Sequence, residues 1–239
     1  MFLDVDGTVL KIARKPDAVE VSEPLRIVLE KLRPLLGGAL ALVSGRTIAD
    51  LDYLFGPLRL PAAGLHGIER RDVRGNLHSE GKPVALDEIR EALEAFTTAH
   101  AGVVIEDKTH AIAVHYRQAP TVKVEVRAEV RRLVAARPDL QILDGKMVFE
   151  IRPCGIDKGA AIRAFMGEPP FVGRTPIFLG DDITDEDGFT IVNDLGGHSI
   201  RVGGGAKTAA RFRLPNVTAV IEWLYWLAED LENKGAGAA

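Results

Sequence analysis

The chain has 239 residues, of which 46% are hydrophobic and 27% charged, with a formal net charge of -4 at pH 7. This length suits one large domain or two small ones, and the composition is that of a globular protein. The slight acidity and the dispersed Lys and Arg residues exclude the basic surface that nucleic-acid binding requires. No apolar stretch reaches the roughly 18 residues of a membrane-spanning helix, and the N-terminus lacks the pattern of a signal peptide.

The single cysteine, Cys154, rules out an internal disulfide and fits a reducing compartment. We therefore expect a cytoplasmic protein with no membrane and no nucleic-acid partner. No paired base is apparent near Cys154, so we expect it to be a buried or half-buried structural thiol.

Apolar strand-like segments alternate with amphipathic segments, which predicts an α/β fold with a mostly parallel sheet. The first helix is expected to begin with Ser22 as its cap and to end at Gly37-Gly38. The other elements expected up to residue 80 are strands over 1–3, 39–43 and 60–64, a helix from 46 to about 55, and a hairpin with its turn at 74–76.

The pattern changes between about 84 and 151, where we predict the order αββαββ. Its helices are expected over 85–100 and 122–136, and its strands over 103–107, 111–116, 141–143 and 148–151. We interpret this block as a smaller α/β domain inserted into a Rossmann-like parallel-sheet core. The predicted boundaries are 1–82 and 153–239 for the core and 83–152 for the insert.

The first pattern then resumes. We predict a helix over 157–166, strands over 176–179 and 198–202, a mobile glycine loop at 203–205, and a last helix from Asn216 to about Leu231. Asn216 is expected to cap this helix, and the tail from Lys234 onward is expected to be disordered.

Two carboxylates stand at the end of the opening apolar run, in Asp4-Val5-Asp6-Gly7-Thr8. Side chains of an extended segment alternate between faces, so Asp4 and Asp6 would point the same way. Two neighbouring carboxylates repel unless a cation lies between them. The pair alone is compatible with a metal site, with a nucleophile beside an acid/base, or with a solvated turn.

Three further polar groups follow apolar strands or open a helix: Ser44 with Arg46, Lys158, and the acidic run from Asp181 to Asp185. In open parallel sheets, ligands bind beyond the carboxyl ends of the strands. Carboxylates hold Mg²⁺, a hydroxyl near a helix start binds phosphate oxygens, and a lysine neutralises charge on a transferred phosphoryl group. Together these groups predict phosphoryl-transfer chemistry.

These segments resemble, in chain order, the four motifs of the haloacid-dehalogenase (HAD) phosphatases, and the insert resembles the type-2 cap of that superfamily. A finer resemblance is to the trehalose-6-phosphate phosphatases. It is carried by Gly180-Asp181-Asp182-Ile183-Thr184-Asp185-Glu186-Asp187, Gly64-Leu65-His66-Gly67, His115-Tyr116-Arg117, and Glu150-Ile151-Arg152-Pro153 followed by Lys158-Gly159.

The resemblance implies residue roles. Asp4 would be the nucleophile and would form an aspartyl-phosphate, and Asp6 would be the general acid and then the general base. Ser44 and Lys158 would bind the phosphoryl group. The implied cofactor is Mg²⁺, with candidate ligands Asp4, Asp6 (through its carbonyl), Asp181, Asp182 and Asp185.

Sugar recognition is expected from the cap. The family pattern maps onto Glu106 with Arg117, and onto Lys146 with Glu150. Arg46 is a further candidate substrate-binding residue and is expected to cap or pair near the active site. Glu106 and Arg117 lie on neighbouring strands of one predicted hairpin, so they could converge. The histidines His66, His110 and His115 lack the spacing of a zinc site, which leaves structural or substrate-edge roles for them.

The expected activity is Mg²⁺-dependent hydrolysis of trehalose 6-phosphate to trehalose and phosphate, with this small sugar phosphate as the expected partner. Five alternatives stay open. They are the same chemistry on sucrose phosphate, on mannosylglycerate phosphate or on glucosylglycerol phosphate, a phosphomutase, and a non-catalytic sugar-phosphate sensor.

Overall fold

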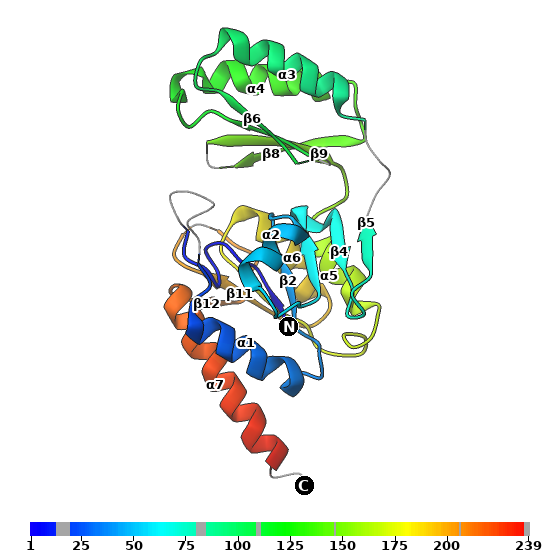
Figure 1. The fold of residues 1–239 in the computed structure, drawn as a ribbon, viewed down its shortest axis with the longest axis vertical. Coiled ribbons are helices and arrows are strands. Elements are labelled where there is room, and N and C mark those ends of the chain that lie inside the picture. The colour runs from blue at the N-terminus through cyan, green and yellow to red at the C-terminus, as the bar shows by residue number, and fades with distance from the viewer. Residues whose placement is uncertain (13–19, 80–84, 109–110, 146, 206, 237–239) are drawn as a thin grey trace. The chain divides into compact units, whose positions relative to one another are not determined.

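The computed structural model describes residues 1–12, 20–79, 85–108, 111–145, 147–205 and 207–236. The chain divides into two compact units, Met1–Glu80 with Asp157–Ala239, and Gly81–Ile156. Each unit has its own sheet and its own helices (Figure 1). The predicted α/β class is confirmed. Among the described residues, no helix is long and apolar enough to cross a membrane.

The larger unit contains an eight-stranded sheet with the order β12-β11-β10-β1-β2-β3-β4-β5. The parallel strands are β1 (Phe2–Leu3), β2 (Ala41–Val43), β3 (Ala62–Gly64), β10 (Ile177–Gly180), β11 (His198–Val202) and β12 (Phe212–Leu214), and the antiparallel ones are β4 (Glu69–Arg71) and β5 (Leu77–Ser79). β1 lies in the middle, where Phe2 is in register with Phe178 and Ala41. The segments that follow β10, β1, β2 and β3 therefore meet at one edge of the sheet.

Helices cover both faces of this sheet. They are α1 (Glu23–Leu35), α2 (Ile48–Phe55), α5 (Lys158–Met166), α6 (Glu186–Asp194) and α7 (Val217–Ala236). On one face, Leu29 of α1 and Leu224 of α7 pack in a core with Leu3. On the other face, Phe165 of α5 packs in a second core with Phe2. Complete burial of such a side chain contributes about 1.5–3 kcal/mol, so this two-sided burial fixes the short central strand.

Two elements of this unit were not predicted. Helix α6 begins directly after the acidic run from Asp181 to Asp185, and its core contacts come from Phe189 and Val192, with the partly buried Ile191 packed beside them. Gly188 within α6 lies against the ring of Phe178, where a Cβ would come within 2.4 Å. Strand β12 has three residues and an exposed Phe212, so it carries no strong strand signal.

Three local predictions need correction, and one is confirmed. Ser22 stands at the N-cap of α1 but makes no side-chain capping bond. Cys154 is exposed rather than buried. Helix α7 continues to Ala236, so the predicted end near Leu231 and the predicted disorder over 234–236 are wrong, while residues 237–239 of that predicted tail lie outside the described residues. Asn216 caps α7 as predicted, because its Oδ1 accepts a bond from Ala219 N at 3.0 Å.

The smaller unit contains the predicted αββαββ order. Its antiparallel sheet has the strand order β6-β7-β9-β8. The elements are α3 (Asp87–Ala99), β6 (Val104–Asp107), β7 (Ile112–His115), α4 (Lys123–Val134), β8 (Leu140–Gly145) and β9 (Val148–Pro153). Leu93 of α3 and Val126 of α4 pack in one core with Ile112 and Ile151. Both helices therefore cover the same face of the sheet, and the opposite face carries Glu150.

Candidate active site

Asp4 follows β1 and lies in a buried, hydrogen-bonded position. Its backbone N–H donates to Leu179 O at 2.9 Å, which continues the pairing of β1 with β10. The whole residue is 4% exposed. Its carboxylate accepts two hydrogen bonds, from Lys158 Nζ at 2.7 Å and from Thr8 Oγ1 at 2.8 Å. A strand of two residues is therefore sufficient to position Asp4, because neighbouring strands and side chains hold it on both sides.

Lys158 is the first residue of α5. The helix starts here because the Asp157 side chain caps it, accepting from Ala160 N at 2.8 Å. The buried Lys158 Nζ donates to Asp4 Oδ1 and to Asp185 Oδ1, both at 2.7 Å. Burial alone would lower the pKa of Lys158, but the carboxylates of Asp185 and Asp4 outweigh it and raise the pKa. Lys158 is therefore an ammonium that bridges two carboxylates.

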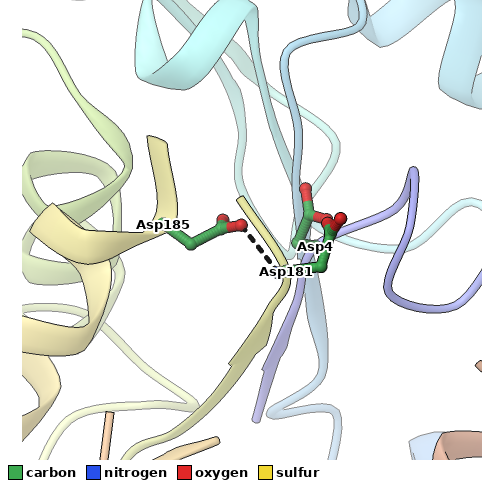
Figure 2. Close-up of side chains that lie close together, drawn as sticks. All are labelled: Asp4, Asp181 and Asp185. Carbon is green, nitrogen blue, oxygen red and sulfur yellow. Dashed lines mark hydrogen bonds between the residues drawn. The ribbon is translucent and has the colours of Figure 1, made fainter. Parts of the chain in front are cut away.

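Asp185 organises the loop after β10. It is fully buried, and its Oδ2 accepts from the backbone N–H groups of Asp181 and Asp182, both at 2.9 Å. Figure 2 shows the Asp185 carboxylate directed at the Asp181 backbone. Both Asp185 oxygens thus have protein donors. Asp182, in contrast, is exposed and uses its Oδ1 to accept from Ile183 N at 2.7 Å.

Among the described residues, Asp4, Asp181 and Asp185 form a group in which one carboxylate oxygen of each lies within 4.8 Å of the others (Figure 2). Burial raises the pKa of each to about 6, with added repulsion from a neighbouring carboxylate. When all three are ionised, the single ammonium of Lys158 leaves two negative charges uncompensated. Hard oxygen donors with this excess charge fit a divalent cation.

Gly7 lies directly against this group. Its φ is +90°, and a Cβ there would lie 2.1 Å from Asp181 Oδ2. We expect Gly7→Ala to lower the phosphate release predicted for this site by about 100-fold, because it displaces a carboxylate of the site. Gly75→Ala is the matched control, since Gly75 has a φ of +87° with no atom within 4 Å. Equal phosphate release by the two variants would show that the contact with Asp181 has no effect on activity.

The metal-free stability should respond to Asp181. A carboxyl group whose pKa is raised on folding stabilises the protein when protonated, so this contribution is lost as the pH rises from about 4 to about 6. We expect Asp181→Asn to raise the free energy of unfolding by about 1 kcal/mol at pH 7.5 without metal, after allowance for partial exposure. Urea denaturation with and without a divalent cation measures this. The wild type should gain stability from the cation and Asp181→Asn should not. The prediction fails if both gain equally.

Asp6 has a different partner from Asp4. Its carboxylate forms a two-point ion pair with Arg46, with Nε–Oδ2 at 2.6 Å and Nη2–Oδ1 at 2.7 Å. Ser44, which is 1% exposed, accepts from Arg46 N at 3.1 Å through its Oγ. Arg46, in the turn after β2, therefore links the two groups. Its backbone N–H binds the Ser44 hydroxyl and its side chain binds the Asp6 carboxylate.

In the smaller unit, the predicted sugar-binding residues are only partly brought together. Glu106 and Glu150 lie on the same face of the sheet, in one row across β6, β7 and β9. Glu106 Oε2 lies 2.9 Å from His115 Nε2, and this bond holds the pKa of Glu106 below its usual value. Arg117 is exposed beyond the end of β7, so the structure pairs Glu106 with His115 rather than with Arg117. Lys146 and His110 lie outside the described residues.

Lys108 was missed in the sequence. Its Nζ donates to Glu150 Oε2 at 3.1 Å, so it joins Glu150 on this polar face of the sheet. A usable signal existed, because Lys108 follows Glu106 by two residues and two residues apart share a strand face.

Comparison of the sequence with known proteins identifies the family. Residues 2–217 match the family model described as Trehalose-phosphatase. The chain belongs to the trehalose-phosphatase family. A Sinorhizobium fredii protein named "Probable trehalose-phosphate phosphatase" is 50% identical over 204 residues, which cover 85% of this chain and 77% of that protein. An Escherichia coli protein named "Trehalose-6-phosphate phosphatase" is 44% identical over 234 residues, which cover 98% of this chain and 88% of that protein.

Solved structures share the fold of this trehalose-phosphatase family member. The C-terminal domain of a C. albicans trehalose-6-phosphate phosphatase superposes with a TM-score of 0.82 at 24% identity, covering 95% of this chain and 91% of that one. A trehalose-6-phosphate phosphatase related protein gives a TM-score of 0.79 at 26% identity and covers 98% of both chains. The family resemblance inferred from the motifs is thus confirmed.

Proposed function

We propose that this protein hydrolyses trehalose 6-phosphate to trehalose and phosphate, as a cytoplasmic enzyme of trehalose biosynthesis. Membership of the trehalose-phosphatase family and 44% identity to the E. coli protein of that name support the substrate. The observation that carries the chemistry is the buried Asp4 carboxylate, held between the Lys158 ammonium and the Thr8 hydroxyl at the carboxyl end of β1. The single cysteine, which fits a reducing compartment, supports the location.

In the proposed reaction, an Asp4 oxygen attacks phosphorus while the bond between phosphorus and the sugar oxygen breaks. Asp6 gives its proton to the departing sugar oxygen, and later takes a proton from the water that releases phosphate from Asp4. Before carrying a proton, Asp6 must give up one of its two bonds to Arg46. Ser44 Oγ and Lys158 would bind phosphoryl oxygens.

We propose Mg²⁺ as the metal ion, held by Asp4 and Asp181 with the Asp6 carbonyl. When bound, it would offset the repulsion between the phosphate dianion and the carboxylates. Asp185 is assigned a supporting role, because both of its oxygens already accept bonds from Lys158 and from backbone N–H groups. Asp182 is assigned to the loop conformation, because its side chain accepts from Ile183 N.

We propose that the smaller unit acts as a cap domain and supplies sugar recognition through its helix-free sheet face. Glu106, Lys108 and Glu150 offer charged groups of both signs that are suited to paired hydrogen bonds with hydroxyls. Arg117 and Lys146 stay candidates from the family pattern.

Glu150 offers a direct test of this assignment. We expect Glu150→Gln to raise KM for trehalose 6-phosphate by about tenfold with little change in kcat, because a charged hydrogen bond to substrate is lost. Glu125→Gln on α4 is the matched control, since Glu125 is exposed on the helical side. Steady-state kinetics measure both. An unchanged KM for Glu150→Gln would remove Glu150 from the sugar site.

The decisive assay for the proposed function is phosphate release from a panel of sugar phosphates, with and without Mg²⁺. We expect release from trehalose 6-phosphate with Mg²⁺ at a kcat/KM that exceeds those for sucrose, mannosylglycerate and glucosylglycerol phosphates. A higher value for one of these others would change the substrate. An isomeric sugar phosphate as product would indicate a mutase, and binding without release from any substrate would indicate a sensor.

A further inference from the structure

The segment Gly64–Gly67 crosses the Ser44–Arg46 turn, outside the four motifs that the mechanism uses. Two backbone bonds join them, from Leu65 N to Arg46 O and from His66 N to Ser44 O, both 2.9 Å. The approach is close enough to require glycine. A Cβ at Gly64 would lie 2.8 Å from Arg46 O, a contact with backbone that cannot relax cheaply.

The His66 side chain continues this contact. A Cβ at Gly45 would lie 2.7 Å from both Cε1 and Nε2 of the His66 ring, so the imidazole packs directly on the backbone of the turn. His66 is half-buried, whereas Ser44 beside it is 1% exposed. The ring thus covers the peptide next to the hydroxyl that the mechanism assigns to the phosphoryl group.

The backbone here is strained. Leu65 has a φ of +48° and His66 a φ of +57°, and the one other described non-glycine residue with positive φ is Met147. Glycine would adopt this conformation without strain. Residues held in sparsely populated conformations concentrate at functional sites. Two consecutive side chains maintained at such a cost indicate that the side chain at position 66 is itself required.

The same segment also reaches α5. A Cβ at Gly67 would lie 2.8 Å from Asp157 O and 3.2 Å from Ala161 Cβ. Asp157 is the residue that caps α5 immediately before Lys158. The segment therefore lies between the turn that carries Ser44 and the helix start that carries Lys158.

We propose that His66 is a positioning residue for phosphoryl binding. Its imidazole packs on Gly45 and holds the Ser44–Arg46 turn so that Ser44 Oγ is presented to a phosphoryl oxygen. This inference rests on the proposed function, in which Ser44 and Lys158 bind the phosphoryl group. It adds His66, which follows strand β3, to the residues that support phosphoryl binding. His66 acts through Ser44 and Arg46.

Two substitutions distinguish the effect of the imidazole ring from the effect of the backbone strain. His66→Gly removes the imidazole and relieves the strain at φ +57°, whereas His66→Asn keeps a polar side chain of a type that tolerates this conformation. The measurement is calorimetric titration of the Mg²⁺-loaded protein with inorganic phosphate, together with kcat and KM for trehalose 6-phosphate. Gly203→Ala is the control for an exchange between glycine and another residue at a position of positive φ, since Gly203 has positive φ and no neighbour within 4 Å.

We expect His66→Gly to raise the Kd for inorganic phosphate by about tenfold and to lower kcat/KM for trehalose 6-phosphate by a similar factor. The reason is that the Ser44–Arg46 turn is no longer held where it presents Ser44 Oγ to the phosphoryl group. His66→Asn should weaken phosphate binding by at least about threefold. A Kd within about twofold of wild type for His66→Gly, or for His66→Asn if the glycine variant does not fold, would overturn the proposal. A wild type that binds phosphate but leaves trehalose 6-phosphate intact would refute the proposed substrate alone.

Discussion

Replacing Asp4 with asparagine is expected to lower kcat for phosphate release by about 10⁴-fold or more. The carboxamide has nearly the shape of the carboxylate, so it can still accept the bond from Thr8 Oγ1. It is not a nucleophile, and it carries no charge to pair with Lys158. Phosphate release from trehalose 6-phosphate, measured with saturating Mg²⁺, gives the result directly.

The control for Asp4→Asn is Asp194→Asn, an exposed aspartate at the end of α6. It makes the same chemical change on the surface of the same unit and should leave kcat unchanged. The thermal unfolding of both variants shows whether the fold is retained. A folded Asp4→Asn protein that retains more than about one hundredth of wild-type kcat would exclude the covalent mechanism through Asp4.

Replacing Lys158 with methionine is expected to have the largest effect on stability. The ammonium lies 2.7 Å from one oxygen each of Asp4 and Asp185, and all three residues are buried. Removing one partner of a buried ion pair leaves uncompensated charge and destabilises proteins by about 3–5 kcal/mol. We expect a loss of this size at pH 8 in metal-free buffer, measured by urea denaturation.

The pH dependence of this loss has a definite sign. The pKa values of Asp4 and Asp185 are about 6 with Lys158 present, and without the ammonium they should rise further. Because both carboxyl groups are then protonated at low pH, Lys158→Met should be destabilised much less at pH 5 than at pH 8. Adding Asp185→Asn should recover part of the stability at pH 8. A Lys158→Met protein as stable as wild type at pH 8 would show that the pair contributes nothing.

The sequence was most informative where apolar runs end in polar residues. The run before Asp4 and the run before Asp181 mark strand ends, and the parallel sheet brings them together because its strands end at one edge. The change of pattern after residue 83 likewise predicts a separate αββαββ unit. Helix α6 was not predicted, because its acidic start and Gly188 hide a helix that is stabilised by packing Phe189 against the sheet.

Side-chain pairing within the site was less predictable. The sequence suggests that Asp4 and Asp6 act as neighbours, but tertiary contacts give them separate partners, Lys158 for Asp4 and Arg46 for Asp6. Glu106 was expected to meet Arg117 and instead contacts His115, because the strand ends before Arg117. Such choices depend on register and on packing between distant segments, which a single sequence does not specify.

Trapping the covalent intermediate tests the central claim most directly. Wild-type protein with Mg²⁺ is mixed with trehalose 6-phosphate that carries a radiolabelled phosphoryl group, quenched in acid during turnover, and digested to peptides. Label on the peptide that contains Asp4, and none in the Asp4→Asn variant, is the result expected if the Asp4 carboxylate attacks phosphorus. Rapid release of labelled phosphate with no label on that peptide at any quench time would contradict it.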